Sequence, residues 1–99
     1  MGYGGWTYIL TNKNHTTLYV GATADILNRM YQHKTKFYPN SFSARYNLNK
    51  LVYFETFTRI EEAFERERLL KAGNRKRKIA LIEKMIPGWD DLYPQLLLE

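Results

Sequence analysis

The chain contains no cysteine among its 99 residues and only two histidines, His15 and His33. The lack of cysteine excludes a disulfide-stabilised fold, a thiolate zinc site and a cysteine nucleophile. Two histidines cannot build a multi-histidine metal centre, so any bound metal must be a hard cation with oxygen ligands, such as Mg²⁺ or Mn²⁺. The absence of cysteine also fits a reducing compartment, and we expect a cytoplasmic protein.

Long apolar runs are missing as well. No stretch approaches the roughly 18 residues that a membrane-spanning helix needs, and the N-terminal residues do not have the pattern of a secretory signal. The chain has 44% hydrophobic and 25% charged residues, an ordinary composition for a soluble protein with one modest core. We therefore expect a single domain over residues 1–99, with a core at about 6–86 and a tail, 87–99, that packs back on it.

Acidic residues are outnumbered by basic ones, 10 to 15, which gives a net charge of +5. The stretch from Lys71 to Lys78 carries five cations and no anion, whereas residues 87–99 carry three acids and no base. A concentrated basic patch favours polyanions such as nucleic acid, and a solvated helix start is an equally good explanation of such a run. The candidate phosphate contacts are Lys34, Lys36, Arg45, Arg75, Lys76, Arg77 and Lys78.

Hydrophobic periodicity predicts the element order ββαβαα, an α+β fold in which helices flank a small sheet of three strands. Runs of aromatic and branched residues predict the strands. The turn residues Asn12 to His15 join the first two into a hairpin. The three strands are expected at residues 6–10, 16–20 and 50–57.

Capping residues predict where the helices begin and end. Gly21 should end the second strand, and Thr23 should cap a helix that ends near Lys34. Residues 35–49 are expected to form a loop with a short helical piece, held down by Phe37, Phe42 and Tyr46. A capping box at Thr58 predicts a helix that ends at Gly73, and a last helix should run from Asn74 to Pro87.

Glu67 breaks the pattern of the helix after Thr58. The apolar stripe of this helix is expected to contain Ile60, Ala63, Phe64 and Leu70, and the same spacing places Glu67 within it. A carboxylate in a core-facing stripe is costly unless it is paired, hydrogen-bonded or metal-bound. Two interpretations remain open, an internal salt bridge to an arginine and a metal-binding carboxylate at the edge of the sheet.

Two other pairs of polar side chains have two interpretations each. Arg29 and His33 lie one turn apart at the border of the apolar stripe of the preceding helix, where they could hold a phosphate or simply be a surface arginine and a half-buried histidine. Tyr8 and Tyr19 should lie nearly opposite each other on the hairpin. Such a pair usually contributes to packing, and it has a role in catalysis only when both hydroxyls face one cation or phosphate.

The ordered set of these residues resembles the GIY-YIG nuclease superfamily. The resemblance extends over about residues 6–93 and is closest to small stand-alone bacterial proteins regarded as predicted endonucleases. It departs from the family where Trp6 replaces the first signature glycine, and where Ile79 and Ile82 occupy the expected positions of a family asparagine. The matching residues are Tyr8, Tyr19-Val20-Gly21, Arg29 ten residues after Tyr19, His33, and Glu67 on a later helix.

The resemblance implies a three-stranded antiparallel sheet flanked by helices and a role for each site residue. Glu67 would hold one Mg²⁺ or Mn²⁺, and Arg29 would be the catalytic arginine. Tyr8 or Tyr19 would take a proton from the attacking water, with Tyr8 slightly preferred, and His33 would position the scissile phosphate or accept a proton. The implied activity is hydrolysis of DNA phosphodiester bonds, as in DNA repair or recombination.

Two other functions are compatible with the same residues. One is a non-catalytic module that binds nucleic acid, DNA or RNA, on the same scaffold. The other is a small protein–protein adaptor with exposed aromatic residues, which the basic charge makes the weakest of the three. Because no separate sequence-reading module fits in this length, the expected nuclease is structure-selective, unspecific, or directed by a protein partner.

Overall fold

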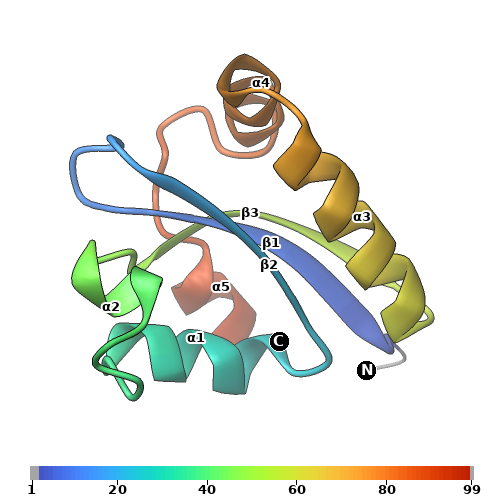
Figure 1. The fold of residues 1–99 in the computed structure, drawn as a ribbon, viewed down its shortest axis with the longest axis horizontal. Coiled ribbons are helices and arrows are strands. Elements are labelled where there is room, and N and C mark those ends of the chain that lie inside the picture. The colour runs from blue at the N-terminus through green and yellow to red at the C-terminus, as the bar shows by residue number, and fades with distance from the viewer. Residues whose placement is uncertain (1–2, 99) are drawn as a thin grey trace.

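A three-stranded antiparallel sheet organises the molecule. The computed structural model describes residues 3–98, and its strands lie in the order β2-β1-β3. Figure 1 shows helices on both faces of this sheet. The predicted α+β class and the three-stranded antiparallel sheet are confirmed. The strands are β1 (Gly5–Thr11), β2 (Leu18–Thr23) and β3 (Lys50–Phe57).

Within residues 3–98 five helices surround the sheet, two more than the ββαβαα pattern contains. The short α2 is the helical piece expected within residues 35–49, and α5 lies in the tail. None of the helices formed by residues 3–98 has the length and apolar character that a bilayer crossing needs. The helices are α1 (Ile26–Lys34), α2 (Phe42–Arg45), α3 (Ile60–Ala72), α4 (Arg75–Met85) and α5 (Tyr93–Leu97).

The central strand β1 is buried along its whole length, because helices cover both of its faces. Its side chains alternate between the two faces of the sheet and belong to two separate apolar clusters. The first cluster joins Tyr8 and Leu10 to Ile26 and Met30 of α1 and to Leu96 of α5. The second contains Ile9, Val20, Val52, Tyr53, Leu70, Ile82 and Trp89, and so packs the sheet against α3 and α4.

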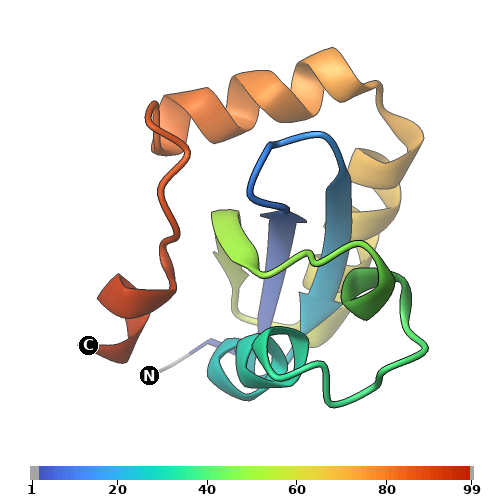
Figure 2. The same cartoon turned by 90° about the vertical axis from the view of Figure 1, so that its left-hand side faces the viewer.

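Asp91 ties the acidic tail to the sheet and to α1. Its carboxylate accepts hydrogen bonds from the backbone amides of Leu51 and Tyr93, both at 3.0 Å, and lies 2.5 Å from Nζ of Lys34. The amide of Leu92 donates in turn to the carbonyl of Leu51 at 2.7 Å. Figure 2 shows the resulting path of the tail, from α4 down to the level of α1.

Two predicted boundaries are wrong. Gly21 and Thr23 belong to β2, because the pairing of β2 with β1 continues through Gly21 opposite Tyr8. Helix α1 is capped by Asp25, whose carboxylate accepts from the amide of Asn28. Helix α3 begins one residue later than the box at Thr58 requires, and Glu62 accepts from the amide of Arg59 at 3.1 Å.

Several aromatic side chains are exposed where packing was predicted. Phe64 is 52% exposed, so it lies outside the buried stripe of α3. Phe37, Phe42 and Tyr46 are exposed as well and do not hold the 35–49 segment down. That segment is held by Leu48 and Ala44, which are buried in the interior.

Candidate active site

The two signature tyrosines lie on one face of the hairpin, in a register slightly different from the predicted one. Tyr19 pairs with Leu10, and Tyr8 pairs with Gly21, so the two tyrosines are diagonal neighbours. The Tyr8 ring lies directly over Gly21. A Cβ atom at position 21 would come within 2.5 Å of both Cζ and Oη of Tyr8. Glycine is therefore required here by the close approach of the ring.

A chain of hydrogen-bonding side chains leads away from Tyr8. Its hydroxyl lies 3.0 Å from Nε2 of His33, and Nδ1 of His33 lies 2.7 Å from Oγ of Ser43. Ser43 is also 3.3 Å from Ser41, which caps α2. The short helix α2 thus orients the His33 ring through Ser43.

Burial and the neighbouring charges set the protonation states at this site. Burial and the Arg29 guanidinium lower the pKa of His33 to about 4, so the imidazole is neutral at neutral pH. Burial, Tyr19 and the charge of Glu67 raise the pKa of Tyr8 well above its usual range, against the opposing effect of Arg29. Arg29 and His33 line the same pocket, and the charges of Arg29 and Glu67 act in opposite directions on the pKa of Tyr8.

Glu67 comes from α3, the helix that packs against β1 and β2. Its side chain is 22% exposed, and Oε2 lies 2.8 Å from Nζ of Lys71, one helical turn away. Lys71 also lies over the ring of Tyr19, 5.8 Å from its centroid. Of the two interpretations of Glu67, the structure contains an ion pair, with a lysine of the same helix in place of the internal arginine that was considered.

Three of the five predicted site residues line a small pocket of about 160 Å³, which we call the site pocket, whereas Tyr8 and Glu67 are not among its lining residues. Strand β2 contributes Tyr19, α1 contributes Arg29 and His33, and the segment up to α2 supplies the outer wall. In the described part of the chain, the outer edge of β2, the strand that contributes to the pocket, has no neighbouring strand. The pocket lining is Tyr19, Arg29, Gln32, His33, Tyr38, Ser41, Phe42 and Ser43.

The predicted phosphate contacts do not form one patch. Lys34 is half-buried in its ion pair with Asp91, so it holds the tail in place. Arg75 donates to the carbonyl of His15 at 2.8 Å, and Lys78 to the carbonyl of Gly73 at 3.2 Å. Of the seven cations, Lys36, Arg45, Lys76 and Arg77 are exposed and make no side-chain hydrogen bond within residues 3–98.

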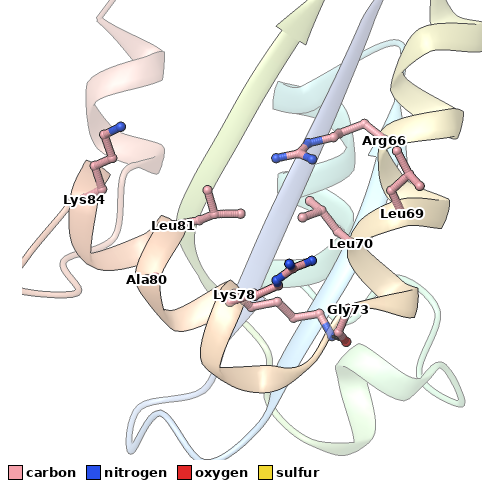
Figure 3. Close-up of a pocket in the computed structure, with 9 residues that line it drawn as sticks. Arg66, Leu69, Leu70, Gly73, Lys78, Ala80, Leu81 and Lys84 are labelled. Carbon is pink, nitrogen blue, oxygen red and sulfur yellow. Dashed lines mark hydrogen bonds between the residues drawn. The ribbon is translucent and has the colours of Figure 1, made fainter.

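A second and larger cavity, of about 510 Å³, lies between α3 and α4. Leu70 of α3 and Leu81 of α4 extend into it from opposite sides (Figure 3). Its rim is basic, with Arg66, Arg77, Lys78 and Lys84. None of the five predicted catalytic residues lines it, so this groove is separate from the site pocket.

The residues at the β2 edge fit a weakly held hard cation. Within residues 3–98 no cluster of three or more histidine, aspartate or glutamate side chains could hold a metal ion. Mg²⁺ is often bound by one or two carboxylates and retains several waters, and Glu67 is the one carboxylate among the five predicted site residues. The ammonium of Lys71 now lies against this carboxylate. Since Lys71 is 53% exposed, its side chain has room to turn away.

Two residues of the site were missed in the sequence. Ser43 lies in a segment without periodicity, where the one local signal is a pair of serines, Ser41 and Ser43, a residue type that favours helix starts. Lys71 was counted with the basic run, although its i, i+4 spacing from Glu67 would have predicted the ion pair.

The fold and site together define a class of protein, a small α+β domain with a polar pocket at an open sheet edge. Its site groups are two phenols, a guanidinium, an imidazole and a carboxylate. The family model described as GIY-YIG catalytic domain matches residues 4–80, and the chain belongs to this family. Families of this kind are generally endonucleases that act on nucleic acid with divalent metal ions. No curated protein and no solved structure matches the chain.

Proposed function

We propose that the protein is a metal-dependent endonuclease that hydrolyses DNA phosphodiester bonds. One observation carries this proposal: the site pocket brings Tyr19 together with Arg29 and His33. The Tyr8 hydroxyl is hydrogen-bonded to that His33, and the charge of Glu67 acts on the same phenol, so that four separate elements contribute to the site. Here Arg29 makes no salt bridge with any described residue, which leaves its guanidinium available for a phosphate.

Tyr8 is the preferred general base, and His33 assists it. Because the pKa of Tyr8 is raised, its phenol is protonated at neutral pH. The phenol oxygen can take a proton from the attacking water while its own proton passes to the unprotonated Nε2 of His33, 3.0 Å away. This transfer requires the His33 tautomer whose Nδ1–H donates to Ser43, and Ser43 lies in position to accept it.

Arg29 and Glu67 complete the chemistry. The guanidinium would neutralise the charge that develops on the phosphorane-like transition state. Glu67 would hold one Mg²⁺ or Mn²⁺ with waters, and a bound cation supplies Lewis-acid polarisation of the phosphate and stabilisation of the leaving 3′ oxygen. The products would carry 5′-phosphate ends, as the family implies.

The exposed cations Lys36, Arg45, Lys76 and Arg77 would contact the DNA backbone. Contacts of this kind give affinity without sequence readout, so we expect unspecific or structure-selective cleavage, or a protein partner that supplies targeting. Each lost contact should reduce the slope of log affinity against log salt by about 1.

The test is nicking of supercoiled plasmid in Mg²⁺ or Mn²⁺ by the variant Glu67→Gln. We expect a loss of at least about 100-fold, since the carboxylate charge is removed while the shape is kept. The matched control is Glu65→Gln on the same helix, where the exposed carboxylate pairs only with Arg68. Equal nicking by Glu67→Gln and the wild type would reject the proposal, provided both variants melt as the wild type does.

One observation favours the second candidate, a non-catalytic nucleic-acid-binding module. The ion pair between Glu67 and Lys71 engages the one carboxylate that would hold the metal. A module of this kind would show salt-dependent binding to nucleic acid, and Mn²⁺ would not broaden the resonances of residues near Glu67. A nuclease would show that broadening in the wild type and not in Glu67→Gln.

A further inference from the structure

The segment between α1 and β3 exposes a group of aromatic rings. Phe37, Tyr38, Phe42 and Tyr46 are 60%, 57%, 49% and 45% exposed. Burial of one such ring would be favourable by about 1.5–3 kcal/mol, so four of them left in water within ten residues of chain mark an interaction surface rather than a part of the core.

These rings continue the wall of the site pocket. Phe42 lies almost parallel to Tyr19, with the ring centroids 6.1 Å apart and an interplanar angle of 27°. Tyr46 follows Phe42 at 4.7 Å. Tyr38 and Phe42 line the pocket together with Arg29. A row of rings, Tyr19, Phe42 and Tyr46, therefore leads outward from the place where a phosphate would be held.

The charge of this segment indicates the kind of ligand. Residues 35–49 contain the cations Lys36 and Arg45, both exposed, and no acidic residue. Exposed aromatic rings interleaved with cations are the arrangement that binds single-stranded nucleic acid, since bases stack on the rings and phosphates pair with the cations. An apolar protein partner would require no such charge.

We propose that the row formed by Phe42 and Tyr46, with Tyr38 beside it, is a stacking surface for unpaired bases of the strand whose phosphate lies at Arg29. The inference rests on the proposed function, because it names the substrate of the same site. Bases inside a duplex are already stacked on each other and cannot use the rings without unpairing. The preferred substrate is therefore single-stranded nucleic acid, or an unpaired stretch at a branch or flap.

The test compares two labelled 12-nucleotide probes by fluorescence anisotropy in EDTA, so that no cleavage occurs. One is oligo(dT), and the other is an abasic strand with the same phosphates and no bases. One stacked base is worth about 5- to 150-fold in affinity, so the wild type should bind oligo(dT) at least about 5-fold more tightly than the abasic strand. Phe42→Leu and Tyr46→Leu should each remove a large part of this preference.

Two controls separate stacking from charge and from general damage. Lys36→Ala should weaken the binding of both probes by a similar factor, because it removes a phosphate contact. Tyr3→Leu changes an aromatic residue that is 50% exposed and does not line the site pocket, so it should leave both affinities unchanged.

The outcomes distinguish this inference from the proposed function. Equal affinity of the wild type for the two probes would overturn the stacking surface, as would a preference that survives in both leucine variants. If the rings dock a protein instead, the wild type would likewise bind the two probes with equal affinity. If plasmid nicking is absent while the oligo(dT) preference and its loss in Phe42→Leu are observed, the stacking surface stands and the nuclease does not.

Discussion

The contact between Gly21 and the Tyr8 ring gives the sharpest prediction. In Gly21→Ala the new Cβ would lie 2.5 Å from Cζ and Oη of Tyr8, and ordinary contact begins at 3.4 Å. The ring must therefore move by about 0.9 Å. Tyr8 is fully buried and its hydroxyl is bonded to His33, so the ring can move only by disturbing the core and that hydrogen bond.

The expected cost has two parts. Overpacking of this kind destabilises a core by about 1–3 kcal/mol, which corresponds to a fall in Tm of roughly 5–20 °C for a domain of this size. A displacement of about 1 Å in a catalytic group can lower the rate about 100-fold. Thermal unfolding by circular dichroism measures the first part, and plasmid nicking in Mg²⁺ at a temperature where the variant is folded measures the second.

Gly73→Ala is the matched control. The nearest atom to a Cβ at position 73 is the carbonyl oxygen of Leu70, at 3.5 Å, and the φ of Gly73 is −77°. Alanine fits there without strain, and it should stabilise the fold by about 0.4–1 kcal/mol by restricting the unfolded chain. If Gly21→Ala melts and nicks like the wild type, the close packing of Tyr8 on Gly21 is refuted.

Three further variants test other parts of the structure. Lys71→Met should raise the affinity for Mn²⁺ by about 2- to 5-fold, because it frees Glu67 from a partly exposed ion pair. Calorimetry measures this affinity, and an unchanged value would show that the ion pair does not compete with the metal. Asp91→Ala should lower Tm by about 10 °C, since it removes about 2 kcal/mol of charged hydrogen bonds. Asp90→Ala, which changes the exposed neighbour, should have little effect on Tm. Equal Tm values for these two variants would contradict the anchoring role of Asp91. The pKa of His33, about 4 when folded and about 6.5 when unfolded, means that the unfolded state binds the extra proton first as the pH falls. The free energy of unfolding of the wild type should thus fall by about 1–2 kcal/mol between pH 7 and pH 4, a value that allows for the partial exposure of the ring. Urea unfolding measures this fall, and a His33→Gln variant with the same dependence on pH would refute the reasoning.

The α3–α4 junction has a different character from the site pocket. Arg66 donates to Glu55 of β3 at 2.9 Å, which attaches α3 to the far edge of the sheet, while Arg77 and Lys84 remain on the rim of the groove. The basic run of the sequence is therefore divided. Lys71 belongs to the β2 edge, and the later cations belong to α4 on the opposite face of the sheet.

The sequence alone determined most of the elements and the family, and it named the candidate site residues. Periods of two and of about 3.6 residues are local properties, so they predicted the three strands and the helices α1, α3 and α4, and the misplaced boundaries at Gly21 and Thr58 were errors of one to three residues. The spacing of Tyr8, Tyr19, Arg29 and Glu67 pointed to the family because motif residues keep their order along the chain.

Only the tertiary structure decided how these residues meet. The glycine at position 21 is explained by a ring that arrives from another strand, and no local pattern contains that contact. Likewise, Phe37, Phe42 and Tyr46 have the hydrophobicity of core residues and are exposed, whereas Leu48 and Ala44 of the same segment are buried. Burial depends on how segments far apart in the chain pack together, so the hydrophobicity of a single residue does not predict whether that residue is buried.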